Sequence, residues 1–293
     1  MSTGTEQESV PAFRVARFDP LSGLRLIGKS PIAVFGAGLV LFWVGAAVLA
    51  PLLAPYDPNA NDFLALADPT PSAAHWLGTD NQGRDLLSRV MWGARTVLTI
   101  APIAVSCAYL IGCALGLLAG YYRGWVDAVV MRLADIILSF PVIILYIIII
   151  TTYGASAFNI VIAVTFTAAP QIIRIIRGLT LDLRDREYVA AAKLSGESAW
   201  HIMAVEILPN ARGPLIVDAC LRMGYTTIAI GVLGFLGLGL PPPNPDWGGM
   251  VRETYGYLQV WPNMAMIPCA AISSLVIGFN LLADGLREIG SRS

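Results

Sequence analysis

The stretch PIAVFGAGLVLFWVGAAVLAPLL, residues 31–53, runs for 23 positions without a charged side chain. An α-helix rises 1.5 Å per residue, so about 20 such residues cross the hydrocarbon core of a bilayer. The stretch therefore predicts a transmembrane helix. The whole chain has the same character, because 56% of its 293 residues are hydrophobic and 13% are charged, whereas a soluble domain has about 25% charged residues.

Five further apolar runs of similar length follow, and none of them alternates apolar with polar residues as the strands of a membrane barrel do. They cover about Thr96–Tyr121, Val129–Thr152, Phe158–Ile176, Pro214–Leu236 and Pro262–Leu282. We therefore predict an all-α integral membrane protein with six transmembrane helices. The first helix, residues 31–53, lies between a tail (1–30) and a loop (54–92), and a membrane core (93–284) precedes a second tail (285–293).

The distribution of positive charge predicts the orientation of these helices. Most of the 19 Lys and Arg residues lie in the two tails, in the 122–132 loop and in residues 174–212. Cytoplasmic segments of membrane proteins carry an excess of Lys and Arg, so we expect both termini in the cytoplasm. Residues 54–92 and 240–261 then face the opposite side. The first 30 residues lack the cleavage site of a signal peptide, so we expect no cleavable leader.

A long polar segment, REYVAAAKLSGESAWHIMAVEILPN at residues 186–210, separates the fourth and fifth runs. Its first half favours helix, with Val189, Ala192 and Leu194 on one apolar side. Gly196 permits a break, and a new helix can begin near Pro209, which has no amide hydrogen to donate. The residues leave two interpretations open: a helix held by another protein, or an amphipathic helix on lipid headgroups.

The same segment resembles the EAA loop of ABC-importer permeases, a pattern of Glu-Ala-Ala, Gly and Leu-Pro between the last spans. Four further stretches resemble the C-type permease subunit of dipeptide and oligopeptide importers. They are HWLGTDNQGRDLLSRVMWGARTVL (75–98), GYYRGWVDAVVMRLADIILSFP (120–141), GLGLPPPNPDWGGM (237–250) and FNLLADGLRE (279–288). The resemblance covers about residues 25–290. It implies the type I importer permease fold and a multi-pass protein of a bacterial inner membrane.

The resemblance also implies that residues 186–199 form a coupling helix, which docks on a cytoplasmic ATPase subunit. The coupling residues implied by the matching segment are Glu187, Tyr188, Ala191, Ala192, Gly196, Leu208 and Pro209. Two positions depart from the family pattern, because Ala190 stands where the family has Glu and Glu206 where it has Ile. Glu187 can supply an acidic contact instead, since residues three apart are neighbours on a helix face.

Asp218 and Arg222 lie inside the fifth apolar run, four residues apart with the acid first, which is the better order for an ion pair within a helix. A lone arginine at bilayer depth costs about 3 kcal/mol on insertion scales. The pair is therefore expected to face protein or a water-filled path. Two roles stay open, namely local pairing that stabilises the helices and contact with a substrate or gate. Arg132 and Asp135, three residues apart, predict a similar pair.

The polar loop contains His75, Asp80 and Asp85, which could be read as metal ligands. Turn and cap chemistry is the favoured interpretation, with Asp80 capping the helix that follows. The loop could also help to receive a substrate-binding protein.

Small residues and one proline predict how the helices pack. Gly112, Gly116 and Gly120 recur every four residues, which predicts a face for close helix packing. Pro141 predicts a kink in the third span.

No motif predicts chemistry in this chain. A GxxxxGK[ST] phosphate loop is absent, and the four cysteines lie in apolar runs without CxxC spacing. We therefore expect no catalytic residue, no metal site, no nucleic-acid partner and no cofactor of its own. In the family that the chain resembles, ATP and Mg²⁺ are bound by partner subunits.

We therefore predict a permease subunit that translocates di- or oligopeptides delivered by an extracytoplasmic binding protein. The partners that the resemblance implies are a homologous second permease, two ABC ATPase subunits and the surrounding lipid. The same architecture could instead carry a nickel complex, an oligosaccharide or an opine. A secondary transporter is a further alternative, although the spans hold few of the midplane ionisable residues typical of that class. A membrane scaffold or enzyme is least favoured, since no HExxH or nucleophile elbow is present.

Overall fold

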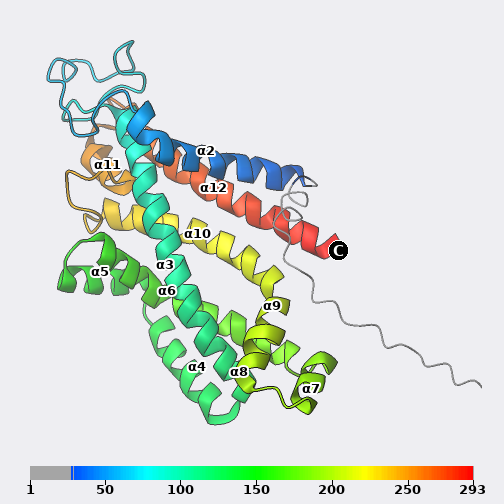
Figure 1. The fold of residues 1–293 in the computed structure, drawn as a ribbon. Helices are drawn as coiled ribbons and strands as arrows, with labels where there is room; N and C mark the ends of the chain where they lie inside the picture. The colour runs from blue at the N-terminus through cyan, green and yellow to red at the C-terminus, as the bar shows by residue number, and fades with distance from the viewer. Residues whose placement is uncertain (1–27, 29, 293) are drawn as a thin grey trace, which may run out of the picture.

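A computed structural model describes residue 28 and residues 30–292, and its regular elements in these ranges are helices (Figure 1). The long helices are α2 (Pro31–Leu53), α3 (Leu86–Tyr122), α4 (Gly124–Leu138), α5 (Val142–Tyr153), α6 (Ala157–Leu183), α10 (Arg212–Phe235) and α12 (Asn263–Arg292). The short elements are α7 (Glu187–Leu194), α8 (Ala199–His201), the π-helix η1 (Ile202–Ile207), α9 (Leu208–Asn210), α11 (Trp247–Thr254) and the 3₁₀-helix η2 (Tyr255–Tyr257).

Five of these helices are long and apolar enough to cross a membrane, and the pair α4 and α5 makes a sixth candidate if it counts as one bent span. The predicted all-α fold class is therefore confirmed. The first helix has the bounds that the apolar run predicts. It begins there because the Ser30 hydroxyl accepts a hydrogen bond from the Ala33 amide at 3.4 Å, and Pro31 occupies the first helical turn, where an amide hydrogen is not needed.

Two helices extend further than the apolar runs predict. Helix α3 begins at Leu86 because Asp85 caps it by accepting a hydrogen bond from the Ser88 amide at 2.8 Å. Residues 86–92 at the end of the predicted polar segment are therefore helical, and the prediction that Asp80 is the cap is wrong. Helix α12 continues to Arg292, so residues 285–292 are helical rather than a separate tail. The predicted tail of residues 1–30 lies almost wholly outside the described residues.

The predicted third span is broken rather than kinked. Helices α4 and α5 meet at an angle of 84° across residues 139–141. Pro141 precedes the first residue of α5, and a proline both lacks an amide hydrogen and disfavours the helical conformation of the residue before it. A single straight helix over 129–152 is therefore excluded.

Helices α3 and α6 pack closely along the predicted glycine face. A Cβ atom added at Gly116 would lie 2.6 Å from Cβ of Ile176, and one at Gly120 would lie 2.6 Å from Cβ of Thr180. Gly112 meets Ile172 in the same way. The small-residue face therefore holds these two helices together, as the four-residue spacing predicts.

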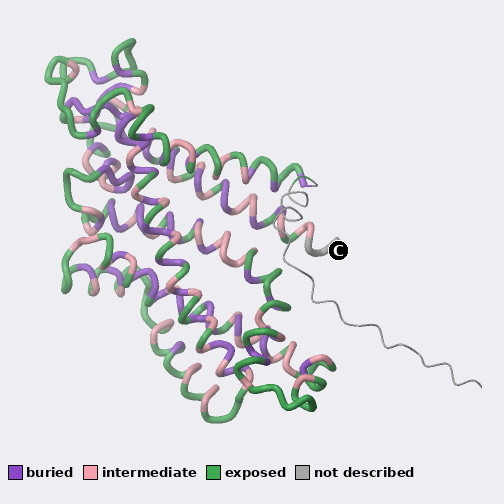
Figure 2. The backbone as a smooth tube through the Cα atoms, in the orientation of Figure 1, coloured by how far each residue is buried: buried purple, intermediate pink, exposed green. Residues whose placement is uncertain are grey.

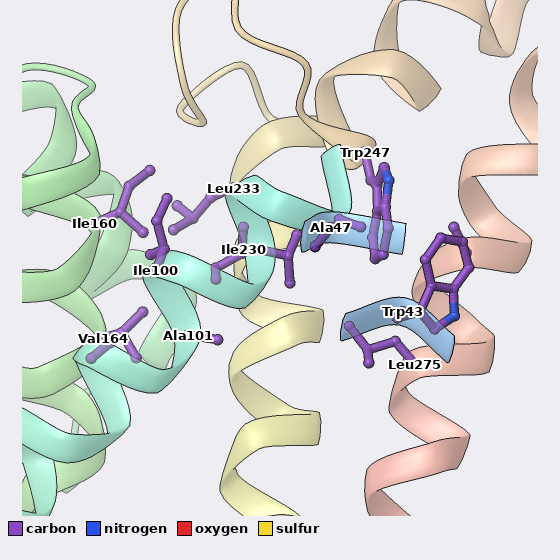
Figure 3. Close-up of a cluster of buried hydrophobic side chains, with 14 of the residues drawn as sticks. Trp43, Ala47, Ile100, Ala101, Ile160, Val164, Ile230, Leu233, Trp247 and Leu275 are labelled. Carbon is purple, nitrogen blue, oxygen red and sulfur yellow. The ribbon is translucent and has the colours of Figure 1, made fainter. Parts of the chain in front are cut away.

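A buried cluster joins α2, α3, α5, α6, α10, α11 and α12 (Figures 2 and 3). The rings of Trp43 and Trp247 belong to this cluster and lie 4.9 Å apart, edge to face. The Trp247 indole donates a hydrogen bond to the Val90 carbonyl at 2.9 Å, and the Trp43 indole donates one to Ser274 at 2.9 Å. These bonds satisfy the polar atom of each ring, so the rings can be buried without an unpaired donor.

The described ends of the chain lie together. The Ser30 hydroxyl donates a hydrogen bond to the Glu288 carboxylate at 3.0 Å, which ties the start of α2 to the last turns of α12. In Figure 1 these ends lie away from residues 54–85 and α11. The molecule therefore has a loop end, formed by residues 54–85 and α11, and an opposite end to which α7 also belongs.

Candidate functional site

The polar segment folds into two short helical pieces separated by a turn at Gly196. Helix α7 ends in a Schellman arrangement, in which the Glu197 amide bonds to the Ala192 carbonyl and the Gly196 amide to the Lys193 carbonyl, both at 3.1 Å. Gly196 has φ +80°, a conformation that side chains disfavour. The predicted coupling helix of residues 186–199 is therefore shorter, because it stops at Leu194.

Helix α7 has one buried and one exposed face. Val189 is 0% exposed and packs with Ile202, Met203 and Ile207 of the following piece. Ala192 and Tyr188 are partly buried against the same cluster.

The exposed face of α7 consists of Glu187, Ala190, Ala191 and Leu194, which are spaced as neighbours on one side of a helix. Leu194 is 90% exposed, so its predicted place on the apolar side with Val189 and Ala192 is wrong. Ala190, the position where the family has Glu, lies on this face beside Glu187. The structure therefore presents a mostly uncharged, small-residue surface on an anchored helix.

The second piece, residues 199–210, begins at Ser198, whose hydroxyl accepts a hydrogen bond from the His201 amide at 3.2 Å. It contains the π-helix η1 and then Leu208 and Pro209. The Leu208 amide bonds to the Met203 carbonyl, five residues back. This wider turn directly precedes Pro209, whose ring cannot be placed in a regular α-helical turn without a clash. The chain then enters α10 at Arg212 without a separate loop.

Charged groups tie the α7 end to the long helices. Lys193 lies over the ring of Tyr121, with Nζ 5.4 Å from the ring centroid. Asp185 accepts hydrogen bonds from Arg123 at 3.0 Å and Arg184 at 3.2 Å. The Arg184 guanidinium beside it holds the pKa of Asp185 below its usual range. These contacts lie at the surface, where ion pairs contribute little to stability.

Asp218 and Arg222 form the ion pair that their spacing predicts, with Nε of Arg222 donating to Oδ2 of Asp218 at 2.6 Å. Tyr109 on α3 donates its hydroxyl to the same carboxylate. Nη1 of Arg222 donates to the Gln171 side chain on α6 at 3.2 Å. The pair is therefore the centre of a network, here called the Arg222 network, that joins α3, α6 and α10.

Arg222 also lines a cavity of about 500 Å³ between α5, α6 and α10. The described residues that line it include one charged side chain, Arg222, and polar groups from Tyr146, Thr167, Gln171 and Tyr225. The Tyr146 and Thr167 hydroxyls lie 3.2 Å apart and are hydrogen-bonded. The volume of this cavity falls in the usual range of sites for small ligands, about 300–1,000 Å³.

A second cavity, of about 600 Å³, is lined by Asp218, Ile175 and Arg287 together with the first turns of α10. On α6 the first cavity ends at Gln171 and the second begins at Ile175, one turn further along. On α10 the boundary falls between Leu221 and Arg222. The Arg222 network therefore stands between the two cavities, a position that the spacing of two residues on one helix could not reveal.

The predicted pair of Arg132 and Asp135 does not form as expected. Asp135 accepts a hydrogen bond from Arg174 on α6 instead. Asp127 binds Arg177 of α6 in the same manner. Helix α4 packs on α6, so the arginines of a neighbouring helix are within reach of its acids, and local spacing alone gave the wrong partner.

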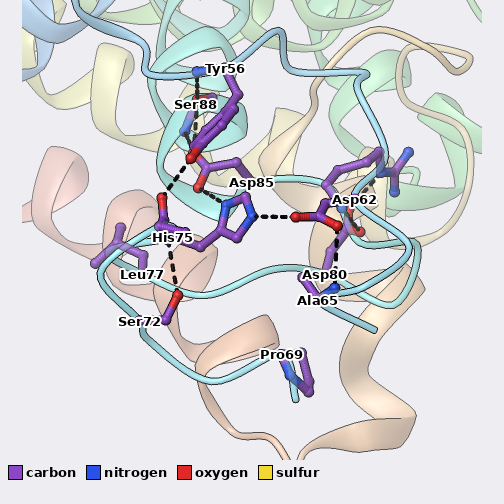
Figure 4. A network of polar contacts seen from close by, with 12 residues as sticks. Tyr56, Asp62, Ala65, Pro69, Ser72, His75, Leu77, Asp80, Asp85 and Ser88 are labelled. Carbon is purple, nitrogen blue, oxygen red and sulfur yellow. Dashed lines mark hydrogen bonds and ion pairs between the residues drawn. The ribbon is translucent and has the colours of Figure 1, made fainter. Parts of the chain in front are cut away.

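At the loop end, His75 and Asp85 form part of a buried polar cluster (Figure 4). The His75 ring contacts Asp85 at 2.9 Å and Asp62 at 3.4 Å. Asp80 pairs with Arg84 at 2.6 Å. None of the described residues forms a group of three or more His, Cys, Asp or Glu placed to hold a metal ion. Asp85 caps α3, and Asp80 accepts hydrogen bonds from the amides of Gln82 and Arg84, so these two acids have the favoured capping and turn roles.

Sequence reasoning did not find Tyr109, Gln171, Tyr146 or Tyr225. Each is a single polar residue within an apolar run, and such residues carry a weak signal of a protein-facing side. Their convergence depends on how α3, α5 and α6 pack around α10.

Two models of known protein families match most of the chain. Residues 112–293 match the family model described as binding-protein-dependent transport system inner membrane component. Residues 24–71 match the N-terminal transmembrane domain of oligopeptide transport permease C.

Individual relatives cover nearly all of the chain. The glutathione transport system permease protein of Pectobacterium atrosepticum is 40% identical over 89% of this chain and 86% of its own. The probable D,D-dipeptide transport system permease protein of Escherichia coli is 38% identical over 99% of this chain and 97% of its own. The dipeptide transport system permease protein of Alkalihalophilus pseudofirmus is 38% identical over 89% of this chain and 85% of its own.

Proposed function

Because this chain belongs to the family of binding-protein-dependent transport system inner membrane components, we propose that it is the C-type permease subunit of an ABC importer for di- or oligopeptides. Three relatives named for dipeptide or glutathione transport support peptides as the substrate class. The structural observation that carries the proposal is α7, a helix anchored by Val189 whose opposite face is free.

The free face of α7 is the docking site for an ATPase subunit. Ala190 and Ala191 let a partner approach closely, Leu194 offers apolar area, and Glu187 offers one charge. Gly196 then turns the chain away, while Leu208 and Pro209 lead the second piece into α10. Movement of the ATPases is thus passed to α10 through a packed cluster rather than through a flexible loop.

The orientation follows from this docking. The α7 end faces the cytoplasm, together with the start of α2 and the end of α12, and residues 54–85 with α11 face outward. The excess of Lys and Arg at the α7 end supports this placement. The outer surface receives the binding protein, and a homologous second permease closes the pathway beside this chain.

The two cavities on either side of the Arg222 network are sections of the pathway. Asp218 and Arg222 act as part of a gate between them, because their contacts with Tyr109 and Gln171 hold α3, α6 and α10 together. Two ATPase subunits bind ATP and Mg²⁺, and nucleotide shifts the population between inward-open and outward-open arrangements. This chain binds and guides the substrate and closes the pathway, and it carries out no chemical step.

Reconstitution tests the proposal. The chain is purified with its second permease and ATPase subunits, placed in liposomes, and supplied with the binding protein and a labelled dipeptide pool. Uptake that needs both ATP and the binding protein is the expected result. Uptake by this chain alone without ATP would show a secondary transporter instead. Ala191→Cys should form a disulfide with cysteines placed in the ATPase groove, and Ala199→Cys on the second piece serves as the matched control.

A further inference from the structure

The hydrogen bonds of Arg222 leave part of its guanidinium unused. Nε donates to Asp218 at 2.6 Å and one Nη1 hydrogen to Gln171 at 3.2 Å. A guanidinium has five N–H donors in one plane, so three remain, one on Nη1 and two on Nη2. Among the described residues, Asp218 and Gln171 accept hydrogen bonds from Arg222, and the Tyr109 hydroxyl also lies close enough to interact with the guanidinium. Arg222 is only 8% exposed, and it lines a cavity.

The cavity favours an anion. Among the described residues that line it, Arg222 is the only charged one, and no carboxylate is present. Asp218 lies on the side of the second cavity, where its charge is shared between Tyr109 and Arg222. Apolar walls from Val142, Ile143 and Val164 lower the local polarity, which strengthens the attraction between unlike charges.

The geometry of the unused donors fits a carboxylate in particular. The remaining hydrogens are on Nη1 and Nη2, the two nitrogens through which the end of an arginine binds both oxygens of a carboxylate by parallel hydrogen bonds. Asp218 fixes the opposite, Nε side of the group, so the guanidinium is already oriented before a ligand arrives.

We propose that Arg222, held by Asp218 and Gln171, is a carboxylate-binding subsite in the pathway and determines specificity for substrates with a free carboxyl terminus. This inference rests on the proposed peptide importer function. It goes further because it assigns selection to the permease itself, in addition to the binding protein. The apolar walls then accept side chains of different kinds, and the common terminal group is what Arg222 recognises.

The experiment compares a free dipeptide pool with the same pool amidated at the carboxyl terminus. The complete reconstituted importer and its binding protein are used, and uptake of each pool is measured by mass spectrometry. The affinity of the binding protein for both pools is measured first, so that each pool is supplied at saturation. Variants are Arg222→Gln and Arg222→Lys, and Arg287→Gln is the matched control because Arg287 lines the second cavity.

The expected result is that Arg222→Gln lowers uptake of the free pool at least tenfold more than uptake of the amidated pool, because loss of its contacts with Asp218 and Gln171 affects both pools alike. Arg222→Lys retains the charge without the fork and should show an intermediate loss. Arg287→Gln should leave the ratio between pools at the wild-type value. Equal loss of both pools in Arg222→Gln would show a structural role and overturn the inference while leaving the importer function intact. Absence of ATP-dependent uptake of both pools by the wild type would overturn the proposed function and the inference with it.

Discussion

The loop end and the α7 end of the molecule both contain charged residues, but only the loop end buries a cluster of them. At the loop end, Asp80, Arg84, Asp85 and Arg89 are all buried. Arg84 binds Asp80 and Glu253, each at 2.6 Å, which ties the loop to α11. At the α7 end, Glu187, Lys193 and Glu197 are exposed.

The difference indicates which charged residues find their partners within this chain and which are available to another subunit. Buried charges are stable only with partners in place, and at the loop end Arg84 and Arg89 pair with Asp80 and Glu253 of the same chain. On α7, Lys193 contacts the ring of Tyr121, whereas Glu187 and Leu194 on the exposed face are available to another subunit. The loop end should therefore control stability, and the α7 end should control coupling with little effect on stability.

The largest expected effect is on the stability of the loop end. Asp80→Ala leaves Arg84 and Arg89 buried with one fewer acid, and breaking a buried pair in this way costs about 3–5 kcal/mol. Thermal unfolding of the purified complex should show a clearly lower midpoint. Asp68→Ala, on the exposed part of the same loop, should leave it unchanged. An unchanged midpoint in Asp80→Ala would contradict the prediction that the buried ion pairs of the loop end stabilise the fold.

The second effect concerns pH. Burial raises the pKa of Asp246, just before α11, from 3.8 to about 6. The folded state thus holds the proton more tightly than the unfolded one, so this group's contribution is complete below about pH 4 and is lost as the pH rises through 6. The loss is on the order of 3 kcal/mol.

Asp246→Asn tests this contribution, because Asn is neutral at every pH and its one amide oxygen can still accept a hydrogen bond from the amide of Gly248 or of Gly249. The variant should lack this part of the decline in stability between pH 4 and 6, measured by unfolding at several pH values. Asp57→Asn is the exposed control. A variant whose stability depends on pH in the same way as the wild type would exclude Asp246 as the source of this decline in stability.

The third effect separates coupling from stability at the α7 end. Gly196→Trp adds bulk where the chain itself has no atom within 4 Å of a Cβ, although the positive φ strains the residue by about 1–2 kcal/mol. Gly196→Asn tolerates that φ and is the matched control. We expect the Trp variant to lower ATP-driven uptake at least tenfold while ATP hydrolysis continues, and the Asn variant to stay within threefold. Normal uptake with Trp would refute docking near Gly196.

The smallest effect is expected at Glu187. An exposed ion pair contributes about 0–1 kcal/mol, so Glu187→Gln should weaken binding of the ATPase subunits no more than about fivefold, with the midpoint of unfolding unchanged. Titration of the ATPase subunits onto the permease pair at two salt concentrations measures it. Glu197→Gln, beyond the turn, is the control. A hundredfold loss of affinity would mean that Glu187 makes a buried contact in place of the Glu that the family has at position 190.

Much of the fold could be predicted from the sequence because the bilayer sets a simple requirement. A run such as residues 31–53 has only one way to satisfy its backbone in hydrocarbon, which is a helix. The glycine spacing at residues 112–120 likewise predicted close packing. The 84° break before α5 was underestimated as a kink, since a proline shows where a helix is weak but not how far its neighbours bend it.

The candidate sites divide in the same way. The Asp218–Arg222 pair was predictable because both members lie on one helix, whereas Tyr109 and Gln171 come from α3 and α6. Asp135 shows the limit of local spacing, because Arg174 of another helix took the place of Arg132. The segment at residues 186–210 was recognised from its pattern, but the inward Val189 and outward Leu194 were not separated by it.

The sequence by itself determined the membrane helices, the glycine contact of α3, the positions of helix breaks and the family, because these depend on composition and on spacing along one element. Only the tertiary structure decided which face of α7 is free, which acid each arginine binds, and that Arg222 stands between two cavities with donors to spare. Those features depend on side chains from separate helices meeting in space, and the free energy of each meeting is set by the packing of the whole bundle rather than by any one segment.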